Sequence, residues 1–409
     1  MPASRTVAVT GLGAVTPLGD AARTWDELVA GTSATTAAPE RLRAAGCEVV
    51  AAVDGFDPSR YMDRYAARHM GRFSQFAVAA CRLAAADAGL DESDVADAGL
   101  VVHTGAGGLI ETEAAAVAAA ARPARVNPYF TPVFGPNMAA CQPSIELGIR
   151  GPVLGGVGAC AAGIQAVIDG LRLVQHGEAD VAIAAGTDAA LSAVLLGSLA
   201  NAGALARAGG NPAAACRPFD RDRTGMVAAE GAAAFVLEPL ERARARGATP
   251  LALVAGGGRS GDAHHVTAPH PEGRGTAAAM ARALGDAGLA PAAVDAVVAH
   301  ATATRAGDQA EARALRTIFG DHLARVAVTA PKGALGHGLG AAGAFGVLVA
   351  VLALRHQLLP PTRNLDHVDP ACAGPAHVAG RPRSGRVGAV LVNGAGFGGQ
   401  NASVLLTGV

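Results

Sequence analysis

Residues 151–171 read GPVLGGVGACAAGIQAVIDGL, and this stretch decides the fold class. It predicts a short apolar strand, a tight turn of glycine and alanine, and an amphipathic helix that begins directly after Cys160. Apolar runs of the same kind, such as VAIAAGTD at 181–188, alternate along the chain with alanine-rich helical windows such as 73–88. The alternation predicts an α/β protein, in which the glycine-rich turns after strands are places for chemistry.

A second series of predicted strands and helices begins near residue 251 and ends with the runs GAVLVNGAG (388–396) and ASVLLTG (402–408). No proline- or serine-rich linker and no block of charge divides the 409 residues, so we expect closely packed parts. The two series share too little sequence identity to show a repeat by letters alone, but their order of elements is similar. We therefore predict two halves of one topology, at 1–248 and 249–409.

Composition argues against several classes of function. The formal net charge of -1 gives no overall field that would gather nucleic acid or an anionic membrane. The six cysteines are scattered without a CxxC pair, and no histidine cluster has metal spacing, so we expect neither a metal site nor disulfides. The apolar stretch at 338–354 is rich in glycine and alanine and slightly short for a membrane span, which favours a buried core helix. The first residues lack a signal-peptide pattern, and we expect a cytoplasmic protein.

Cys160 is the first candidate for a reacting group. A cysteine at the N-terminus of a helix feels the positive end of the helix dipole, which lowers the pKa of the thiol and favours the nucleophilic thiolate. The alternative is a small buried apolar residue, which is the commoner role of a cysteine. The glycine and alanine neighbours leave room for a substrate and favour the nucleophile.

Two further stretches place polar groups after predicted strands. VDAVVAH ends at His300 and runs into a segment that carries Thr302, Thr304 and then Glu311. VTAPKGALGHGLGAAG places the only lysine of the chain in a glycine-rich loop with a second histidine; these residues are Lys332 and His337. A lone lysine among arginines indicates a site that needs a compact ammonium group, whereas each histidine taken singly is more often structural.

Together these stretches resemble the elongating β-ketoacyl-carrier-protein synthases (KAS I/II type) of the thiolase superfamily, which serve fatty acid or type II polyketide synthesis. The resemblance runs nearly end to end, through VTGLGAVTPLGD (9–20), GACAAG (158–163), RPFDRDRTGMVAAEGAAAFVLE (217–238), GDAHHVTAP (261–269), HATAT (300–304), PKGALGHGLGAAG (331–343) and NGAGFGGQNAS (393–403). It implies a thiolase-like α/β fold, with two duplicated halves in a five-layered αβαβα arrangement.

The resemblance also implies roles for single residues. It places a catalytic triad on Cys160, His300 and His337, with Lys332 as the accompanying lysine and Glu311 as the partner of that lysine. The implied reaction is a decarboxylative Claisen condensation, in which Cys160 holds the growing acyl group and a malonyl extender supplies the enolate. We expect no bound cofactor, because both substrates are carried on the phosphopantetheine of an acyl carrier protein.

Further residues resemble the family's binding positions. The backbone N–H of Phe397 would share the oxyanion with that of Cys160, and its ring resembles a gatekeeper; the alternative is simple packing against the sheet. Three threonines resemble positions that contact pantetheine, although capping of strand ends is the plainer explanation: Thr267, Thr302 and Thr304. Two small residues suggest a roomy acyl tunnel that accepts long or functionalised chains: Ala106 and Ala395.

Arg60, Arg64, Arg68 and Arg72 recur every four residues, so on one helix they would form a basic stripe. Such a stripe suits an acidic carrier protein, and the family uses this region for docking. The alternative is an ordinary solvated helix face.

Other functions remain open at this point. The main rival is a non-catalytic chain-length factor that pairs with a ketosynthase, but such subunits usually lack the nucleophile. A thiolase would need a second cysteine in the C-terminal glycine-rich loop, and an initiating synthase would have asparagine at His337. The family dimerises, so we expect a homodimer or a heterodimer with a homologous subunit.

Overall fold

The computed structural model describes residues 5–409, and its main feature is a sheet of eleven strands. The first half contributes five strands in the order β1 (Val7–Val15), β8 (Gly231–Pro239), β6 (Ala182–Asp188), β4 (Gly99–Thr104) and β5 (Val153–Val157). The second half contributes β9 (Ala252–Gly261), β16 (Gln400–Thr407), β15 (Ala389–Gly396), β10 (Ala296–Val298) and β11 (Ala327–Thr329), with β13 (Ala376–His377) at the edge.

The two halves have the same topology. In each half the first strand of the chain lies beside the last, followed by the fourth, the second and the third. The first two neighbouring pairs are antiparallel and the next two are parallel in both halves. The predicted duplication is thus confirmed. We propose that the division falls between residues 248 and 249, because helix α11 (Leu240–Ala245) completes the first half and β9 opens the second.

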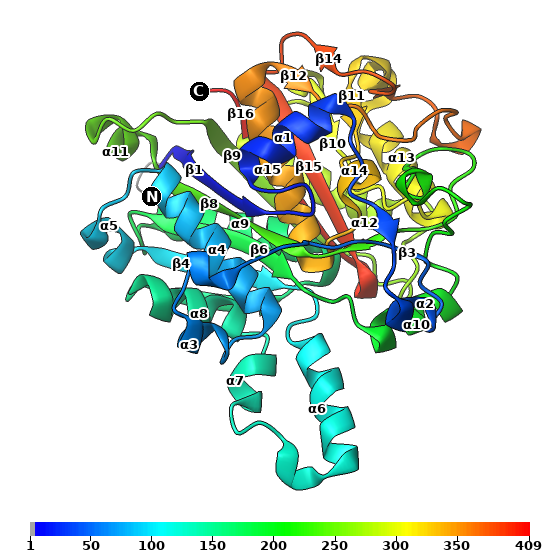
Figure 1. Ribbon diagram of the computed structural model, residues 1–409. Helices are drawn as coiled ribbons and strands as arrows, with labels where there is room; N and C mark the ends of the chain where they lie inside the picture. The colour runs from blue at the N-terminus through cyan, green and yellow to red at the C-terminus, as the bar shows by residue number, and fades with distance from the viewer. Residues whose placement is uncertain (1–4) are drawn as a thin grey trace.

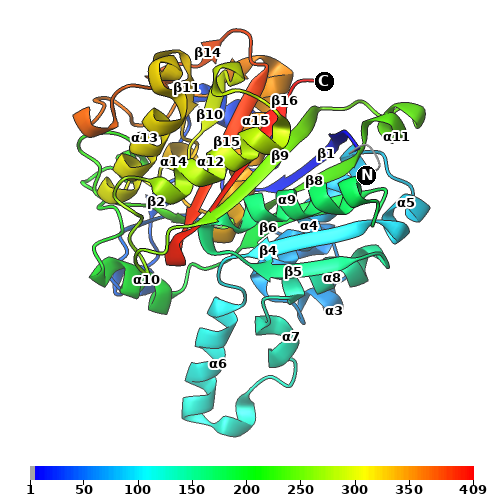
Figure 2. The ribbon, with the colours of Figure 1, turned by 180° about the vertical axis from the view of Figure 1, so that it is seen from behind.

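The halves are joined more closely than two separate sheet layers would be. Strand β1 pairs with β9 through Ala8 opposite Leu253 and Val9 opposite Ala252, so hydrogen bonds run through one continuous sheet. Two central helices, α9 (Ala162–His176) and α15 (Ala342–His356), pack against each other and lie between the strands of the two halves (Figures 1 and 2). Each of these helices contacts strands of both halves.

Two outer layers complete the five-layered arrangement. Helices α4 (Arg72–Asp87) and α8 (Met138–Leu147) cover the first half, and α12 (Arg274–Ala287) and α13 (Arg305–Phe319) cover the second (Figure 2). The stretch Leu339–His356 is long and apolar enough to cross a membrane, but 83% of it is buried inside the fold. The expectation of a buried core helix is therefore confirmed by α15.

Small residues allow these layers to approach closely. On β1, a Cβ atom at Gly13 would lie 2.0 Å from the carbonyl oxygen of Ala80 in α4. On β9, a Cβ atom at Gly258 would lie 2.1 Å from the carbonyl oxygen of Ala279 in α12. Both strands thus need glycine where a helix crosses them. The glycines of VTGLG and VAGGG hold equivalent places in the two halves.

The remaining elements surround this core. The helices are α1 (Ala21–Ala30), α2 (Glu40–Arg43), α3 (Arg64–Ala67), α5 (Glu92–Asp97), α6 (Leu109–Ala121), α7 (Phe130–Phe134), α10 (Ala193–Asn201) and α14 (Lys332–Leu335). The short strands are β2 (Thr36–Ala37), β3 (Val49–Ala51), β7 (Ala228–Ala229), β12 (Leu358–Leu359) and β14 (Arg383–Ser384). Helices α6 and α7 project from the body as an arm (Figure 1).

Candidate active site

Cys160 lies in the tight turn that joins β5 to α9. The turn is a short 3-10 helix, η3 (Ala159–Ala161), and α9 begins directly after it. Ala159 adopts the left-handed backbone region with φ of 47°, which is uncommon for a residue with a side chain and is found often at functional sites. Gly396 of β15 packs against the turn, since a Cβ atom there would lie 3.1 Å from the backbone nitrogen of Cys160. The thiol is half-buried and so remains accessible.

His300 follows β10, and Glu311 of α13 holds its backbone. Glu311 Oε1 accepts the N–H of His300 at 2.9 Å, and Oε2 accepts the N–H of Ala301 at 2.7 Å. The side-chain amide of Asn393 donates to Oε1 at 3.1 Å. Because Glu311 is only 4% exposed, these three donors replace the water that its carboxylate would otherwise need. Glu311 therefore fixes the strand end from which His300 projects.

Lys332 opens α14, and His337 follows that helix. The N–H of His337 donates to the Val227 carbonyl at 2.7 Å, and its own carbonyl accepts the N–H of Ala229 at 2.9 Å. The imidazole rings of His300 and His337 face each other edge to face, with centroids 5.4 Å apart and planes at 88°. Nδ1 of His337 is buried without a hydrogen-bond partner among residues 5–409. This side chain is thus free to act on a ligand.

The expected pairing of Lys332 with Glu311 takes a different form. The two side chains make no direct ion pair, because the oxygens of Glu311 are already bonded to N–H donors. Burial lowers the pKa of Lys332 to about 8, and the carboxylate of Glu311 and the thiol of Cys160 act in the opposite direction. Glu311 therefore acts on the ammonium group through its field rather than by contact.

The thiol of Cys160 does not have the lowered pKa that its helix position predicts. Burial raises the pKa of Cys160 to about 11, although the Lys332 ammonium and the N–H groups of Phe397 and Cys160 itself lower it. Asp188 adds to the increase. Loss of solvent around a charge outweighs the helix terminus here, so the resting residue is a thiol. Attack on a substrate then requires a base that takes its proton.

Both imidazoles are suited to neutral-state chemistry. Burial is the main cause that lowers the pKa of His300 well below 6.5, and the charges of Lys332 and His337 lower it further. Burial and the Lys332 ammonium lower the pKa of His337 in the same way. At neutral pH each ring therefore has one N–H donor and one free nitrogen acceptor.

Phe397 lies in the loop after β15 and is 44% exposed. Its N–H points toward the Cys160 sulfur and lowers the pKa of the thiol. The loop is fixed to a second loop, because Gly398 N–H donates to the Val266 carbonyl at 2.7 Å and the Gly399 carbonyl accepts the N–H of Asp262 at 2.9 Å. The accessible ring of Phe397 is compatible with the predicted gatekeeper role.

The predicted pantetheine residues lie in different surroundings. The hydroxyls of Thr302 and Thr304 hydrogen bond to each other at 3.0 Å on either side of Ala303, whose φ of 65° is left-handed. Thr267 is exposed, and its hydroxyl lies 3.3 Å from Nδ1 of His265. The structure therefore brings Thr302 and Thr304 together and leaves Thr267 on an exposed loop.

The two small residues of the expected tunnel lie on different faces. Ala106 follows Gly105, and a Cβ atom at Gly105 would lie 3.2 Å from the Ala159 carbonyl beside the nucleophile. In β15, Gly394 and Gly396 face the turn that carries Cys160. Ala395 alternates with them and lies on the opposite face of the sheet. A tunnel role is compatible with Ala106, whereas Ala395 does not face the nucleophile turn.

The single basic stripe predicted for Arg60, Arg64, Arg68 and Arg72 is wrong. The segment is broken into a 3-10 turn at Pro58–Arg60, the short helix α3 and helix α4, which begins at Arg72. Gly71 precedes α4 with extended backbone angles, φ of -66° and ψ of 151°, and it packs closely, since a Cβ atom there would lie 2.6 Å from the Val133 carbonyl.

Arg72 has a structural role instead of a free docking surface. Its Nη2 lies 2.8 Å from Glu230 Oε1, its Nε lies 3.0 Å from Glu230 Oε2, and Nη2 also donates to the Val53 carbonyl at 2.8 Å. Arg64 and Arg68 are exposed and line a surface cavity of 320 Å³. Arg60 is exposed as well, so Arg72 is the one member of the predicted stripe that is not free to meet a partner.

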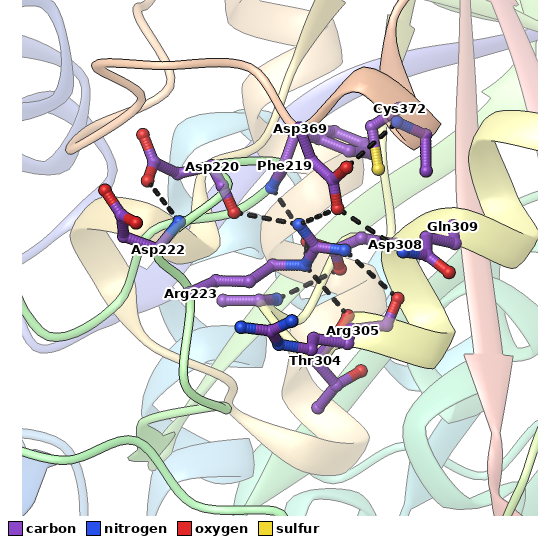
Figure 3. A network of polar contacts seen from close by, with 12 residues as sticks. Phe219, Asp220, Asp222, Arg223, Thr304, Arg305, Asp308, Gln309, Asp369 and Cys372 are labelled. Atoms are coloured by element: carbon purple, nitrogen blue, oxygen red, sulfur yellow. Dashed lines mark hydrogen bonds and ion pairs between the residues drawn. The ribbon is translucent and has the colours of Figure 1, made fainter.

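A buried arginine supports the Thr302–Thr304 segment and was not singled out from the sequence. The Arg223 side chain is fully buried, with Nη1 2.7 Å from Asp369 Oδ2 and Nε 3.4 Å from Asp308 Oδ2 (Figure 3). Its Nε also donates to the Thr304 carbonyl at 3.3 Å. Asp308 in turn accepts the N–H of Ala303 at 3.1 Å. The partners come from distant parts of the chain, so no local sequence pattern predicts this network.

Comparisons with known proteins identify the same family from both halves. Residues 4–243 match the family profile "Beta-ketoacyl synthase, N-terminal domain". Residues 251–366 match the profile "Beta-ketoacyl synthase, C-terminal domain". The two profiles cover most of the chain and include every one of the candidate catalytic side chains.

Individual proteins are similar over the whole length. The 3-oxoacyl-[acyl-carrier-protein] synthase 2 of Coxiella burnetii is 38% identical, with 99% of each chain covered. The solved structure of the ishigamide ketosynthase/chain length factor superposes with a TM-score of 0.92 at 34% identity, with 100% of both chains covered. A type II polyketide acyl-carrier protein in complex with its hexaketide-bound ketosynthase gives a TM-score of 0.92 at 27% identity, covering 99% of this chain and 100% of that one.

Proposed function

The chain belongs to the β-ketoacyl synthase family, and from this premise we propose that it lengthens an acyl thioester by decarboxylative Claisen condensation with a malonyl group on an acyl carrier protein. It is an acyltransferase-type condensing enzyme of fatty acid or type II polyketide synthesis. One observation supports the assignment of roles to residues. The thiol of Cys160, at a helix N-terminus, lies in one site with two neutral imidazoles, those of His300 and His337, and with one ammonium group.

The first step loads the acyl group. The sulfur of Cys160 attacks the thioester carbon, a new carbon–sulfur bond forms, and the pantetheine thiol leaves after the tetrahedral intermediate collapses. The N–H groups of Cys160 and Phe397 stabilise the oxyanion, since they already point toward the sulfur. The thiol proton passes to a neutral imidazole, because the resting group is not a thiolate, and the imidazole then gives this proton to the departing pantetheine sulfur and is neutral again.

The second step makes the carbon nucleophile. A malonyl thioester loses CO₂, and the electron pair of the broken bond becomes an enolate. The N–H groups of His300 and His337 stabilise the enolate oxygen, and neutral rings do this without giving up a proton to the carbanion. Lys332 keeps the local potential positive while its ammonium persists.

The third step forms the product. The enolate carbon attacks the thioester on Cys160, a carbon–carbon bond forms and the carbon–sulfur bond breaks. The cysteine leaves as thiolate and takes up a proton from solvent. The lengthened β-ketoacyl group remains on the carrier protein. The chemistry needs no bound cofactor, because thioester activation and loss of CO₂ supply the driving force.

We assign binding of the carrier protein and its pantetheine arm to residues around the entrance to this site. The hydroxyls of Thr302 and Thr304 suit the amides of the pantetheine arm, and Thr267 stands on the exposed loop beside the gate. Arg64 and Arg68 suit the acidic surface of a carrier protein. We also propose a homodimer or a heterodimer with a homologous subunit, working in the cytoplasm; one similar structure contains a carrier protein with its ketosynthase, and another is a ketosynthase/chain length factor.

The decisive experiment is intact-mass spectrometry after incubation with an acyl-carrier-protein thioester. The wild type and Cys141→Ala, which removes the other half-buried cysteine, should both gain the acyl mass. Cys160→Ala should gain none. If the wild type takes up no acyl group even with candidate partner subunits, the catalytic assignment fails and the chain acts as a chain-length factor.

A further inference from the structure

The nucleophile turn has a counterpart in the second half of the molecule. GACAAG at 158–163 and GLGAAG at 338–343 each form a short 3-10 helix that continues into a central helix. Ala159 and Leu339 both have left-handed φ angles, of 47° and 49°. The residue that follows each is Cys160 in the first half and Gly340 in the second. Gly340 therefore stands where the nucleophile would stand.

The backbone donors around the nucleophile are repeated as well. The N–H groups at the Cys160 sulfur belong to Cys160 and to Phe397, the first residue after β15. Strand β6 occupies the place of β15 in the strand order of the first half, and the first residue after β6 is Ala189. Gly340 and Ala189 thus provide the counterpart of the oxyanion hole.

This second hole is filled by a side chain of the protein itself. Asp188 Oδ2 accepts the N–H of Gly340 at 2.9 Å, and Oδ1 accepts the N–H of Ala189 at 3.2 Å. The Asp188 side chain is completely buried. The two oxygens of one carboxyl group thus accept from the two donors whose counterparts in the first half would share a single oxyanion.

The same carboxylate also connects the loops around the nucleophile. Oδ2 accepts the N–H of Gly105 at 3.0 Å, and Oδ1 lies 3.4 Å from the Thr104 hydroxyl. A Cβ atom at Gly105 would lie 3.0 Å from Gly340 N and 3.2 Å from the Ala159 carbonyl. One buried side chain thus joins the turn before Ala106 to the turn after His337, and Gly105 of the first of these turns packs against the nucleophile turn.

We propose that Asp188 is a positioning residue of the active site: its carboxylate occupies the second half's copy of the oxyanion hole and holds the Gly105 and Gly340 turns in register with the nucleophile turn. The consequence for catalysis rests on the proposed function. Without the carboxylate, the donors of Gly105 and Gly340 would be buried unpaired, and the turn that carries His337 would lose its anchor.

Asp188 also has an electrostatic effect that a purely structural residue would lack. Burial raises the pKa of Asp188 to about 7, while the N–H donors of Gly340 and Gly105 hold it down. In its ionised form it raises the pKa of Cys160, against the Lys332 ammonium, and the neighbouring His300 and His337 are neutral. Removal of this negative charge should lower the pKa of the thiol.

The test compares Asp188→Asn with Asp295→Asn in the full-length protein. Asp295 is a matched control because its Oδ2 also accepts two backbone N–H groups, those of Gly388 at 2.6 Å and Ala389 at 3.0 Å, but at the start of β15. The rate of Cys160 alkylation by iodoacetamide is measured against pH. Hydrogen–deuterium exchange is measured on peptides that cover 102–108 and 338–342.

In Asp188→Asn the alkylation midpoint should move about one unit toward lower pH, both peptides should exchange faster, and condensation should fall about tenfold or more. Asp295→Asn should resemble the wild type in all three. An unchanged midpoint with unchanged exchange would overturn the proposal. If asparagine prevents folding, Asp188→Ser keeps a small acceptor oxygen and is judged by the same two readouts. Neither readout needs condensation, so failure of the proposed function would appear separately as absence of acyl loading.

Discussion

The two imidazoles differ from ordinary histidines in the pH range where they become charged. Burial and the Lys332 ammonium lower the pKa of His300 and His337 well below 6.5. A lowered folded-state pKa means that the rings stay neutral as the pH falls through 6.5 and become protonated only further down. We expect the rate of malonyl decarboxylation to stay nearly constant between about pH 7.5 and pH 6. Because the pKa of Asp188 is about 7, a drop centred near 6.5 would contradict this assignment if it persists in Asp188→Asn. His337→Ala should abolish decarboxylation while leaving acyl loading of Cys160 in place.

The lysine acts on the nucleophile through its charge. The Lys332 ammonium lowers the pKa of Cys160, so Lys332→Met should raise that pKa and slow alkylation of the thiol at pH 8 by about tenfold, which corresponds to one unit. Because burial lowers the pKa of Lys332 to about 8, the wild type should lose this assistance as the pH rises through 8. Lys332→Arg keeps a positive charge and should restore most of the rate. Equal alkylation rates in the methionine variant and the wild type would show that the charge has no such effect.

At the residue scale the sequence predicts which side chains meet, but not their protonation. The four candidate catalytic residues all follow predicted strands: Cys160, Lys332 and His337 in glycine-rich turns, and His300 before a segment with two threonines. The structure brings them to one place. The lowered pKa expected for Cys160 is wrong, because the desolvation that raises it depends on the surrounding fold. Asp188 and Arg223 went unnoticed, since each is bonded to parts of the chain more than 80 residues away.

At the element scale, the region from the 3-10 turn at Pro58–Arg60 to α4 separates carrier binding from stability. Arg64 and Arg68 are exposed, whereas Arg72 opens α4 and pairs with the buried Glu230. The double variant Arg64→Ala, Arg68→Ala should raise KM for carrier-bound substrates about tenfold, more at low salt, without changing Tm. Substrates on free pantetheine should be used as well as by the wild type. A loss shared by both kinds of substrate would argue against docking here.

Arg72→Ala is the matched comparison within the same region. It leaves the Glu230 carboxylate buried without its partner, so it should lower the free energy of unfolding by about 2 kcal/mol, a value reduced because Arg72 is partly exposed. The soluble fraction should keep its KM for the carrier. Urea unfolding measures the first effect and steady-state kinetics the second. An increase in KM without loss of stability would show that Arg72 contributes to carrier docking.

The elements themselves follow from the sequence better than their boundaries do. The apolar runs give the strands, and the stretch 338–354 gives the core helix α15. The periodic arginines were misleading, because a spacing of four predicts one helix only if nothing interrupts it. The extended backbone at Gly71 ends the run before α4, and Gly71 packs against Val133, a contact between distant segments that no local periodicity reports.

At the scale of the whole molecule, the duplicated sheet explains both the active site and an open edge. The two central helices bring the equivalent turns of both halves together. The turn of the first half carries the nucleophile, and the turn of the second half carries the oxyanion-hole copy that Asp188 fills. The order of the predicted elements was enough to predict the duplication. It did not predict the pairing of β1 with β9, because the sequence pattern within each half does not depend on how the two halves pair. The sheet then ends at β5, where no strand among residues 5–409 covers the outer edge.

That edge predicts how the molecule assembles. Strand β5 exposes Leu154 to 41% and Val157 to 56%, and an apolar edge strand left open favours pairing with another chain. The nucleophile turn begins immediately after β5, so a partner on this edge would stabilise the position of Cys160. We expect a second copy or a homologous subunit to add its own β5 there. In a symmetric pair each substitution appears on both sides of the interface, which doubles its effect.

Leu154→Asp should therefore prevent pairing through β5 and reduce acyl loading of Cys160 about tenfold, because a symmetric pair would carry like charges on both sides of the edge. Light scattering after size exclusion measures the mass, and intact-mass spectrometry measures the loading. Val194→Asp is the control, since Val194 is 64% exposed on α10 and lies away from β5. A wild type that is monomeric alone but dimeric with a homologous subunit would select the heterodimer. A Leu154→Asp variant with the mass and loading of the wild type would show that β5 is not the interface, and the exposed apolar side chains of the α6–α7 arm, such as Val117, would be the next surface to test.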